Sequence, residues 1–237
     1  MNKQTFKLGE DWLTTGKALE ITENKISVIL SNETEKKIEK SWSIVQKIVD
    51  KGHPVYGINT GFGPLCTTKI SKSETNILQT NILQSHSVGV GDPIKTDIAK
   101  LMLILKAQSL AKGFSGIALK TLKRIIWHIE NDAIPIVPSQ GSVGASGDLA
   151  PLSHLFLPLI GMGKVEYKNE LITTATLFEK TGLEPIALGP KEGLALINGT
   201  QFIAAHAVKV VSQLHSLLAQ ADIIGAMMIE GLQGSVK

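Results

Sequence analysis

The chain has 237 residues, of which 43% are hydrophobic and 19% are charged, and its mean hydropathy is +0.15. This balance excludes a disordered or fibrous protein, and a chain of this length can bury a large core. The net charge is only +3, and Arg124 is the only arginine. Because no basic stretch alternates with aromatic residues, we expect no nucleic-acid partner.

Three features favour a cytoplasmic location. Cys66 is the only cysteine, so the chain has no disulfide framework and a reducing compartment suits it best. Residues 1–5 lack the apolar core of a secretory signal. The longest uninterrupted apolar stretches, such as residues 155–163, are shorter than the roughly 18 residues that a membrane helix needs, so no membrane contact is expected.

The apolar pattern predicts a mainly helical protein with a small strand-containing N-terminal part. Residues 1–31 hold short segments, and the alternation over residues 25–30 predicts a strand. A helix is expected to begin at Asn32 and to end at Gly52, because apolar residues recur between them at helical spacing. Further helices are predicted over residues 73–86, 95–112 and about 117–131.

Glycine and turn residues interrupt this pattern in three places. Residues 56–64 and 141–148 are glycine-rich and predict loops, and residues 164–173 predict a small hairpin around Lys168 and Asn169. The segment 141–148 matches neither a P-loop nor the dinucleotide-binding fingerprint. Taken alone, it would be interpreted as a tight structural loop.

From residue 200 onward the sequence predicts one long apolar helix, in which only Lys209, Asp222 and Glu230 are charged. Such a helix must be buried among other helices, but few residues follow it. We therefore expect the chain to be incomplete, or to be completed by copies of itself. The expected division is an N-terminal domain over residues 1–190 and the start of a truncated helical bundle over residues 191–237.

Residues 141–154 read Gly-Ser-Val-Gly-Ala-Ser-Gly-Asp-Leu-Ala-Pro-Leu-Ser-His. This stretch resembles the prosthetic-group signature of the aromatic amino-acid ammonia-lyases. The resemblance implies that Ala145, Ser146 and Gly147 cyclise and lose water to form 4-methylidene-imidazol-5-one, without an external cofactor or a metal. Ring closure brings the amide nitrogen of Gly147 onto the carbonyl of Ala145, and glycine lacks the Cβ that would obstruct this approach.

Two further segments resemble the same family, so the resemblance spans nearly the whole chain. Residues 56–63 are similar to the loop that carries the family's catalytic tyrosine, which implies that Tyr56 removes the β-proton of the substrate. Residues 198–201 are similar to the segment whose asparagine lines the site, which implies that Asn198 orients the substrate. The alternatives are that Tyr56 is an ordinary packing aromatic and that Asn198 is a helix N-cap.

Ser85 and His86 end the helix predicted over residues 73–86. The Ser-His pair is similar to that of family members that act on histidine, whereas phenylalanine enzymes tend to have Phe-Leu and tyrosine enzymes His-Leu. The imidazole of His86 can hydrogen-bond a substrate imidazole; the alternative is a capping histidine. The resemblance thus implies elimination of ammonia from L-histidine to give trans-urocanate, with Ser85, His86 and Asn198 binding the substrate.

The resemblance also implies the ammonia-lyase fold, with the start of a long-helix bundle, and a homotetramer in which several subunits build each site. Members of the family run far beyond this length, and their later half supplies a carboxylate-binding arginine. Arg124 matches no such motif. Two alternatives stay open: a phenylalanine or tyrosine ammonia-lyase or aminomutase on the same scaffold, and a lyase-like fragment without turnover. His154 is expected to pack behind the glycine-rich segment.

Overall fold

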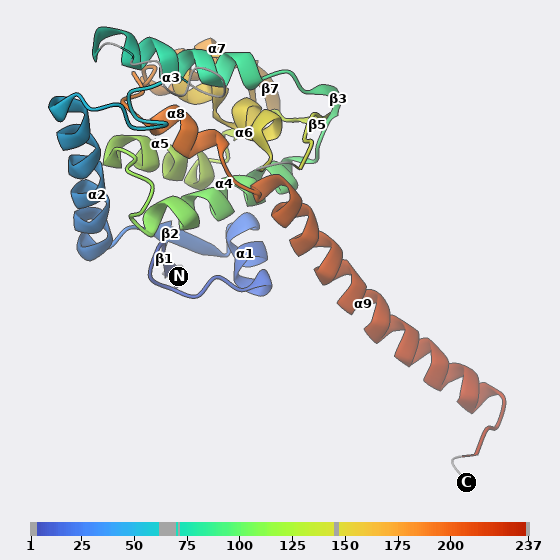
Figure 1. Cartoon of the computed structure of the whole chain (residues 1–237). Helices are drawn as coiled ribbons and strands as arrows, with labels where there is room; N and C mark the ends of the chain where they lie inside the picture. Colours follow the sequence, from blue (N-terminus) through green and yellow to red (C-terminus); the bar gives the residue numbers. More distant parts are fainter. Residues whose placement is uncertain (1–3, 62–69, 71, 145–146, 236–237) are drawn as a thin grey trace.

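The computed structural model describes residues 4–61, 70, 72–144 and 147–235, and shows a body of short helices and small sheets from which one long helix projects (Figure 1). The helices are α1 (Thr15–Thr22), α2 (Asn32–Lys51), α3 (Lys72–His86), α4 (Thr96–Ala111), α5 (Leu119–Glu130), α6 (Leu149–Phe156), η2 (Leu157–Ile160), α7 (Thr174–Thr181), α8 (Glu192–Ile197) and α9 (Gln201–Gly231). The strands are β1 (Gln4–Lys7), β2 (Ile26–Ile29), β3 (Val90–Pro93), β4 (Ile134–Pro135), β5 (Pro138–Gln140), β6 (Lys164–Tyr167) and β7 (Glu170–Thr173).

The strands form three small sheets at the edges of the helical body. β1 and β2 pair in parallel, β3 and β5 pair antiparallel, and β4, β6 and β7 form an antiparallel sheet in that order. The hairpin predicted over residues 164–173 is confirmed, and it turns through Lys168 and Asn169, both at positive φ. The strand expected at residues 25–30 is β2, whereas the pattern did not predict β1, β3, β4 or β5.

The helix predicted from Asn32 to Gly52 is confirmed at both ends. The hydroxyl of Ser31 accepts a hydrogen bond from the amide of Thr34, and Gly52 ends the helix at φ +70°, a backbone conformation that favours glycine. Its buried side chains include Ile38 and Val45. Local spacing and end residues were sufficient here because each lies within a few residues of its partner.

Helix α4 runs through the centre of the core. Its residues 101–104 are at most 1% exposed, and α4 packs against α1, α5 and the first part of α9. The mainly helical fold expected from the sequence is therefore the one observed. Two lysines on this helix, Lys100 and Lys106, are also buried.

Helix α9 leaves the body after its first turns (Figure 1). Ala205 is its one buried residue, so within this chain the prediction that the helix is covered by others is not met. Within the part of the chain that the structure describes, the stretch Glu192–Gly231 is long and apolar enough to cross a membrane by length and composition alone. Polar residues divide this stretch, so it is not an uninterrupted apolar run. The core helix of a soluble protein also meets the criterion of length and composition.

His128 on α5 gives a prediction about acid stability. Its ring is 1% exposed, and Nδ1 donates to the carbonyl of Ala133 at 2.7 Å. Burial lowers the pKa of His128 from 6.5 to about 4. Below pH 6.5 the unfolded chain therefore gains a proton that the folded chain does not, so the free energy of unfolding should fall by about 2 kcal/mol between pH 7 and pH 5.

His128→Gln should remove most of this pH dependence, because glutamine does not titrate. The exposed His215 supplies the control, since His215→Gln should leave the dependence as it is in the natural chain. Urea unfolding at pH 7 and pH 5 measures all three proteins. An identical loss of stability in the His128→Gln protein would show that other groups cause it.

Candidate active site

A buried carboxylate joins the glycine-rich segment 141–148 to the start of α9. Asp148 is fully buried; its Oδ1 accepts from the hydroxyl of Ser142 at 2.7 Å, and its Oδ2 accepts from the amides of Phe202 and Ile203 at 3.0 and 3.1 Å. Thr200, at the N-cap of α9, makes no side-chain capping bond. Asp148 thus caps α9 from a distant segment, where the positive end of the helix dipole also favours its charge.

Gly147 lies directly against Gly199. Its φ is +123°, and a Cβ placed on it would lie 2.6 Å from the carbonyl oxygen of Gly199 and 2.9 Å from its nitrogen. The amide of Asp148 donates to the same carbonyl at 2.6 Å. Only glycine fits at residue 147, which suits the group predicted from residues 145–147. The other two residues of that triplet, Ala145 and Ser146, lie outside the described residues.

Asn198 ends α8 and comes directly before this contact. Its amide donates to Leu194 at 3.0 Å, and its main-chain carbonyl accepts from Nζ of Lys106 at 2.7 Å. Because α9 begins only after Thr200, the alternative that Asn198 is the N-cap of that helix is wrong. The side chain of Asn198 is on the exposed side of the chain, one residue from the glycine that contacts Gly147.

Helix α8 is held by buried polar contacts, although it has only six residues. Glu192 is 1% exposed and accepts from the amides of Ala118 at 3.0 Å and Gly189 at 2.6 Å. The amide of Gly193 donates to Oε1 of Gln79 on α3 at 2.9 Å. These contacts fix α8 to the elements around it, and so fix the position of Asn198.

The loop that carries Tyr56 rests on α8. A Cβ placed on Gly57 would lie 2.5 Å from Cδ2 of Leu194, which is one helical turn before Asn198. Asn59 shapes this loop: its Oδ1 accepts from the amide of Val55 at 2.8 Å and its Nδ2 donates to the carbonyl of His53 at 2.9 Å. Tyr56 itself is 57% exposed. The fold therefore brings the loop beside the Asn198 segment and leaves the Tyr56 side chain more than half exposed.

His86 is the last residue of α3, and its ring is half-buried. Nδ1 lies 2.9 Å from the carbonyl of Ile82 and 3.1 Å from the hydroxyl of Ser85. Since a carbonyl can only accept, Nδ1 carries the hydrogen, and the neutral ring keeps Nε2 as an acceptor. Nδ1 thus bonds a carbonyl in the last turn of α3, as the capping alternative requires, and Nε2 can accept a hydrogen bond from another donor.

The residues after His86 reach the glycine-rich segment. A Cβ placed on Gly141 would lie 3.0 Å from Cα of Gly89, and the amide of Gly89 donates to Nε2 of His154 at 3.0 Å. Burial lowers the pKa of His154, which favours the neutral ring that can accept this bond. His154 therefore packs behind the segment, as the sequence predicts.

The sequence analysis missed Lys106. Its side chain is 2% exposed, and burial lowers its pKa to about 7. With Asn198, it lines a cavity of about 210 Å³ whose other described lining residues are Ser109, Leu110, Ser115, Lys191, Leu194 and Ala195. The sequence did contain a signal for this residue, because a lysine stands among the apolar residues of the helix predicted over residues 95–112.

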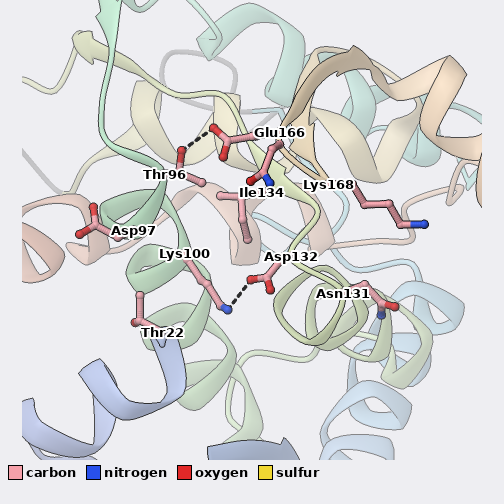
Figure 2. A pocket seen from close by; sticks show the side chains of 10 residues that line it. Thr22, Thr96, Asp97, Lys100, Asn131, Asp132, Ile134, Glu166 and Lys168 are labelled. Atoms are coloured by element: carbon pink, nitrogen blue, oxygen red, sulfur yellow. Dashed lines mark hydrogen bonds and ion pairs between the residues drawn. The ribbon is translucent and has the colours of Figure 1, made fainter. Parts of the chain in front are cut away.

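A second, polar cavity of about 470 Å³ lies elsewhere, between α1, α4 and the turn of the β6–β7 hairpin (Figure 2). Lys100 points toward Asp132, with Nζ 2.5 Å from Oδ1, and also donates to Oδ1 of Asn24 at 2.7 Å. None of the described residues lining it is a predicted site residue. Among the described residues, no group of three or more His, Cys, Asp or Glu is placed to hold a metal ion.

Comparison with known proteins places these segments in one family. A family model described as aromatic amino acid lyase matches residues 13–237. The histidine ammonia-lyase of Shouchella clausii is 47% identical over 211 residues, which cover 89% of this chain and 42% of that protein. The chain therefore spans less than half of the length of this relative.

Two solved structures share the fold. The histidine ammonia-lyase of Trypanosoma cruzi superposes with a TM-score of 0.90 at 36% identity, over 98% of this chain and 45% of that chain. The tyrosine aminomutase of Streptomyces globisporus superposes with a TM-score of 0.87 at 34% identity, over 97% of this chain and 43% of that chain. Both contain the whole body seen here within a longer protein.

Asp148→Asn tests the buried junction. The amide keeps the shape of the carboxylate but replaces one acceptor oxygen by a donor, so Ser142 or the amides of Phe202 and Ile203 lose their acceptor. We expect the free energy of unfolding to fall by about 2–4 kcal/mol, measured by urea unfolding.

The matched control is Asp97→Asn. Asp97 also reaches α9, through a 2.6 Å ion pair with Lys209, but both side chains are partly exposed. Its loss should cost less than about 1 kcal/mol. Equal losses in the two variants would contradict a special role for the Asp148 junction.

Proposed function

The chain belongs to the aromatic amino acid lyase family, and from this premise we propose that it is the N-terminal half of a histidine ammonia-lyase. The proposed reaction removes ammonia from L-histidine and gives trans-urocanate. One observation carries the proposal: Gly147 of the prosthetic-group triplet lies against Gly199, next to Asn198. Two of the predicted site segments thus meet, although they are far apart in the sequence.

The prosthetic group proposed for Ala145, Ser146 and Gly147 is 4-methylidene-imidazol-5-one, which supplies an electrophilic methylene that no unmodified side chain offers. The backbone around it favours such a group. Gly147 has no Cβ to obstruct the contact with Gly199, and the amide of Asp148 is bonded to the Gly199 carbonyl. The buried Asp148 carboxylate keeps both segments of this contact in place, because it is bonded to the amides of the first turn of α9.

Tyr56 is proposed as the base that removes the β-proton of the substrate. That proton is only weakly acidic, so the phenolic oxygen must act where water is excluded. Tyr56 is 57% exposed in this chain, and the contact of Gly57 with Leu194 anchors its loop near Asn198. A substrate bound at Asn198 would thus lie beside the tyrosine loop, and further protein must cover the phenol.

His86, Ser85 and Asn198 are proposed to bind L-histidine. Nε2 of His86 can accept the N–H of the substrate imidazole, because Nδ1 is committed as a donor to Ile82. The side-chain amide of Asn198 can bond the amino-acid part of the substrate. The histidine ammonia-lyases of Shouchella clausii and Myxococcus xanthus are 47% and 40% identical to this chain, which supports histidine as the substrate.

Helix α9 supports the proposal of a homotetramer for the complete protein. Its exposed apolar side chains include Leu214, Leu217, Ile224 and Met227, each more than half exposed. Burying such a surface favours association strongly. A cytoplasmic location, without membrane or nucleic-acid partners, completes the proposal.

The prosthetic group can be tested by mass. If Ala145, Ser146 and Gly147 close the ring and lose two waters, the intact mass of the complete gene product should be about 36 Da below that of its sequence. Ser146→Ala should restore the unmodified mass, because the lost hydroxyl is that of Ser146.

Two outcomes would count against the proposal. A soluble, folded natural protein with the unmodified mass contradicts the prosthetic group. A protein that shows the mass loss but forms no urocanate from L-histidine is instead the non-catalytic alternative.

Substrate choice can be tested at His86. His86→Leu should leave the mass loss intact and lower kcat/KM for histidine by about one to two orders of magnitude, because a buried substrate nitrogen loses its partner. Phenylalanine should be accommodated better, since leucine is apolar. The ratio of the histidine to the phenylalanine kcat/KM is the quantity to measure.

Tyr56→Phe is the control for this ratio. It should lower turnover of both substrates, because it removes the base and leaves the contacts to the substrate side chain in place. If the ratio is unchanged in the His86→Leu protein, His86 is a structural residue and the assignment of histidine loses its main support.

A further inference from the structure

Lys106 lies in the core, and no carboxylate in the described part of the chain is bonded to it. Its side chain is 2% exposed, and the one hydrogen bond described for its ammonium group runs to the main-chain carbonyl of Asn198, at 2.7 Å. The cavity beside it is lined by a second lysine, Lys191, and by no carboxylate among the described residues. Burying an ammonium group in such surroundings costs free energy, as the lowered pKa of Lys106 reflects. The bond to Asn198 is the compensating contact.

The carbonyl that Lys106 holds belongs to the peptide unit that faces Gly147. The C=O of Asn198 and the N–H of Gly199 are opposite edges of one planar group. Lys106 binds the carbonyl edge, and the nitrogen edge lies 2.9 Å from the position that a Cβ on Gly147 would occupy. Rotating this peptide plane would move both edges together. The bond from Lys106 to the carbonyl therefore also fixes the position of the Gly199 nitrogen beside Gly147, because both atoms belong to one rigid peptide unit.

We propose that Lys106 is a positioning residue, which fixes the Asn198–Gly199 peptide plane against Gly147 and thereby holds the backbone on which the prosthetic-group triplet closes. This inference rests on the proposed function, since it concerns the same site. Lys106 does not touch the reacting atoms. It acts through Asn198, whose position it fixes by the carbonyl, and through Gly199.

Lys100 provides a matched control on the same helix. It is 3% exposed, and its ammonium group is bonded to Asp132 and Asn24, in the cavity shown in Figure 2. Removing either ammonium group should therefore disturb the core. Only the removal of Lys106 should change how fast the ring forms, because only that lysine is bonded to the Asn198–Gly199 peptide.

The experiment follows ring formation in the complete gene product after cell-free synthesis, as the appearance of the mass loss over time. Lys106→Met keeps an unbranched side chain without the donor, and should slow ring formation by about tenfold, the change expected for one lost charge-assisted hydrogen bond. Lys106→Arg, which keeps a donor, should restore most of the rate. Lys100→Met should form the ring at the natural rate, even with a lower thermal midpoint.

Each outcome decides the inference. If Lys106→Met forms the ring at the natural rate, the inference is overturned and the proposed function is unaffected. The same holds if Lys100→Met slows ring formation equally, because that would indicate a general loss of stability. A natural protein that never shows the mass loss overturns the proposed function and this inference with it. If Lys106→Met is insoluble, Lys106→Gln takes its place, because its amide is one bond shorter than lysine and cannot reach the same carbonyl.

Discussion

The site depends on the burial of the Asp148 carboxylate. A carboxylate can remain charged in a protein interior only if donors replace its water, and here a hydroxyl and two helix amides do so. These donors come from the glycine-rich segment and from the first turn of α9. The requirement to satisfy one charge therefore brings together two parts of the chain that share no local pattern. The contact of Gly147 with Gly199 follows from this junction.

Helix α8 connects this junction to the other site segments through its contacts. Glu192 accepts from the amide of the residue that caps α5, and Gly193 donates to a side chain on α3. Leu194 contacts the Tyr56 loop, and Asn198, the C-cap of α8, directly precedes Gly199. Helix α8 thus contacts the Tyr56 loop directly and adjoins the Gly147–Gly199 contact through its C-cap. The site residues that it does not reach in this way are the Ser85–His86 pair. That pair is connected through the body of α3, which packs on both α8 and α6. The short helix acts as the common support of the site.

The exposed parts of the chain are as informative as the buried ones. Tyr56 and the apolar side of α9 are both exposed to solvent. The proposed chemistry needs a site from which water is excluded, and an apolar helix surface is stabilised by burial against other protein. The chain spans 42% of the length of the histidine ammonia-lyase of Shouchella clausii and 47% of that of Myxococcus xanthus. Cover from further protein would shield both the Tyr56 side chain and the apolar side of α9 from water, which links the proposed activity to the proposed assembly.

The sequence by itself determined the elements whose signals are local. Helix α2, the β6–β7 hairpin and the long α9 follow from spacing, end residues and turn residues that lie within a few positions of one another. The family motifs also named the triplet, Tyr56, His86 and Asn198, and these assignments remain predictions. Only the tertiary structure decided that Asp148 caps α9, that Gly147 meets Gly199 and that Lys106 holds Asn198. Asp148 and Phe202 are 54 positions apart, and Lys106 and Asn198 are 92 positions apart. Such pairings leave no periodic pattern in a single sequence, because they are set by how the helices pack.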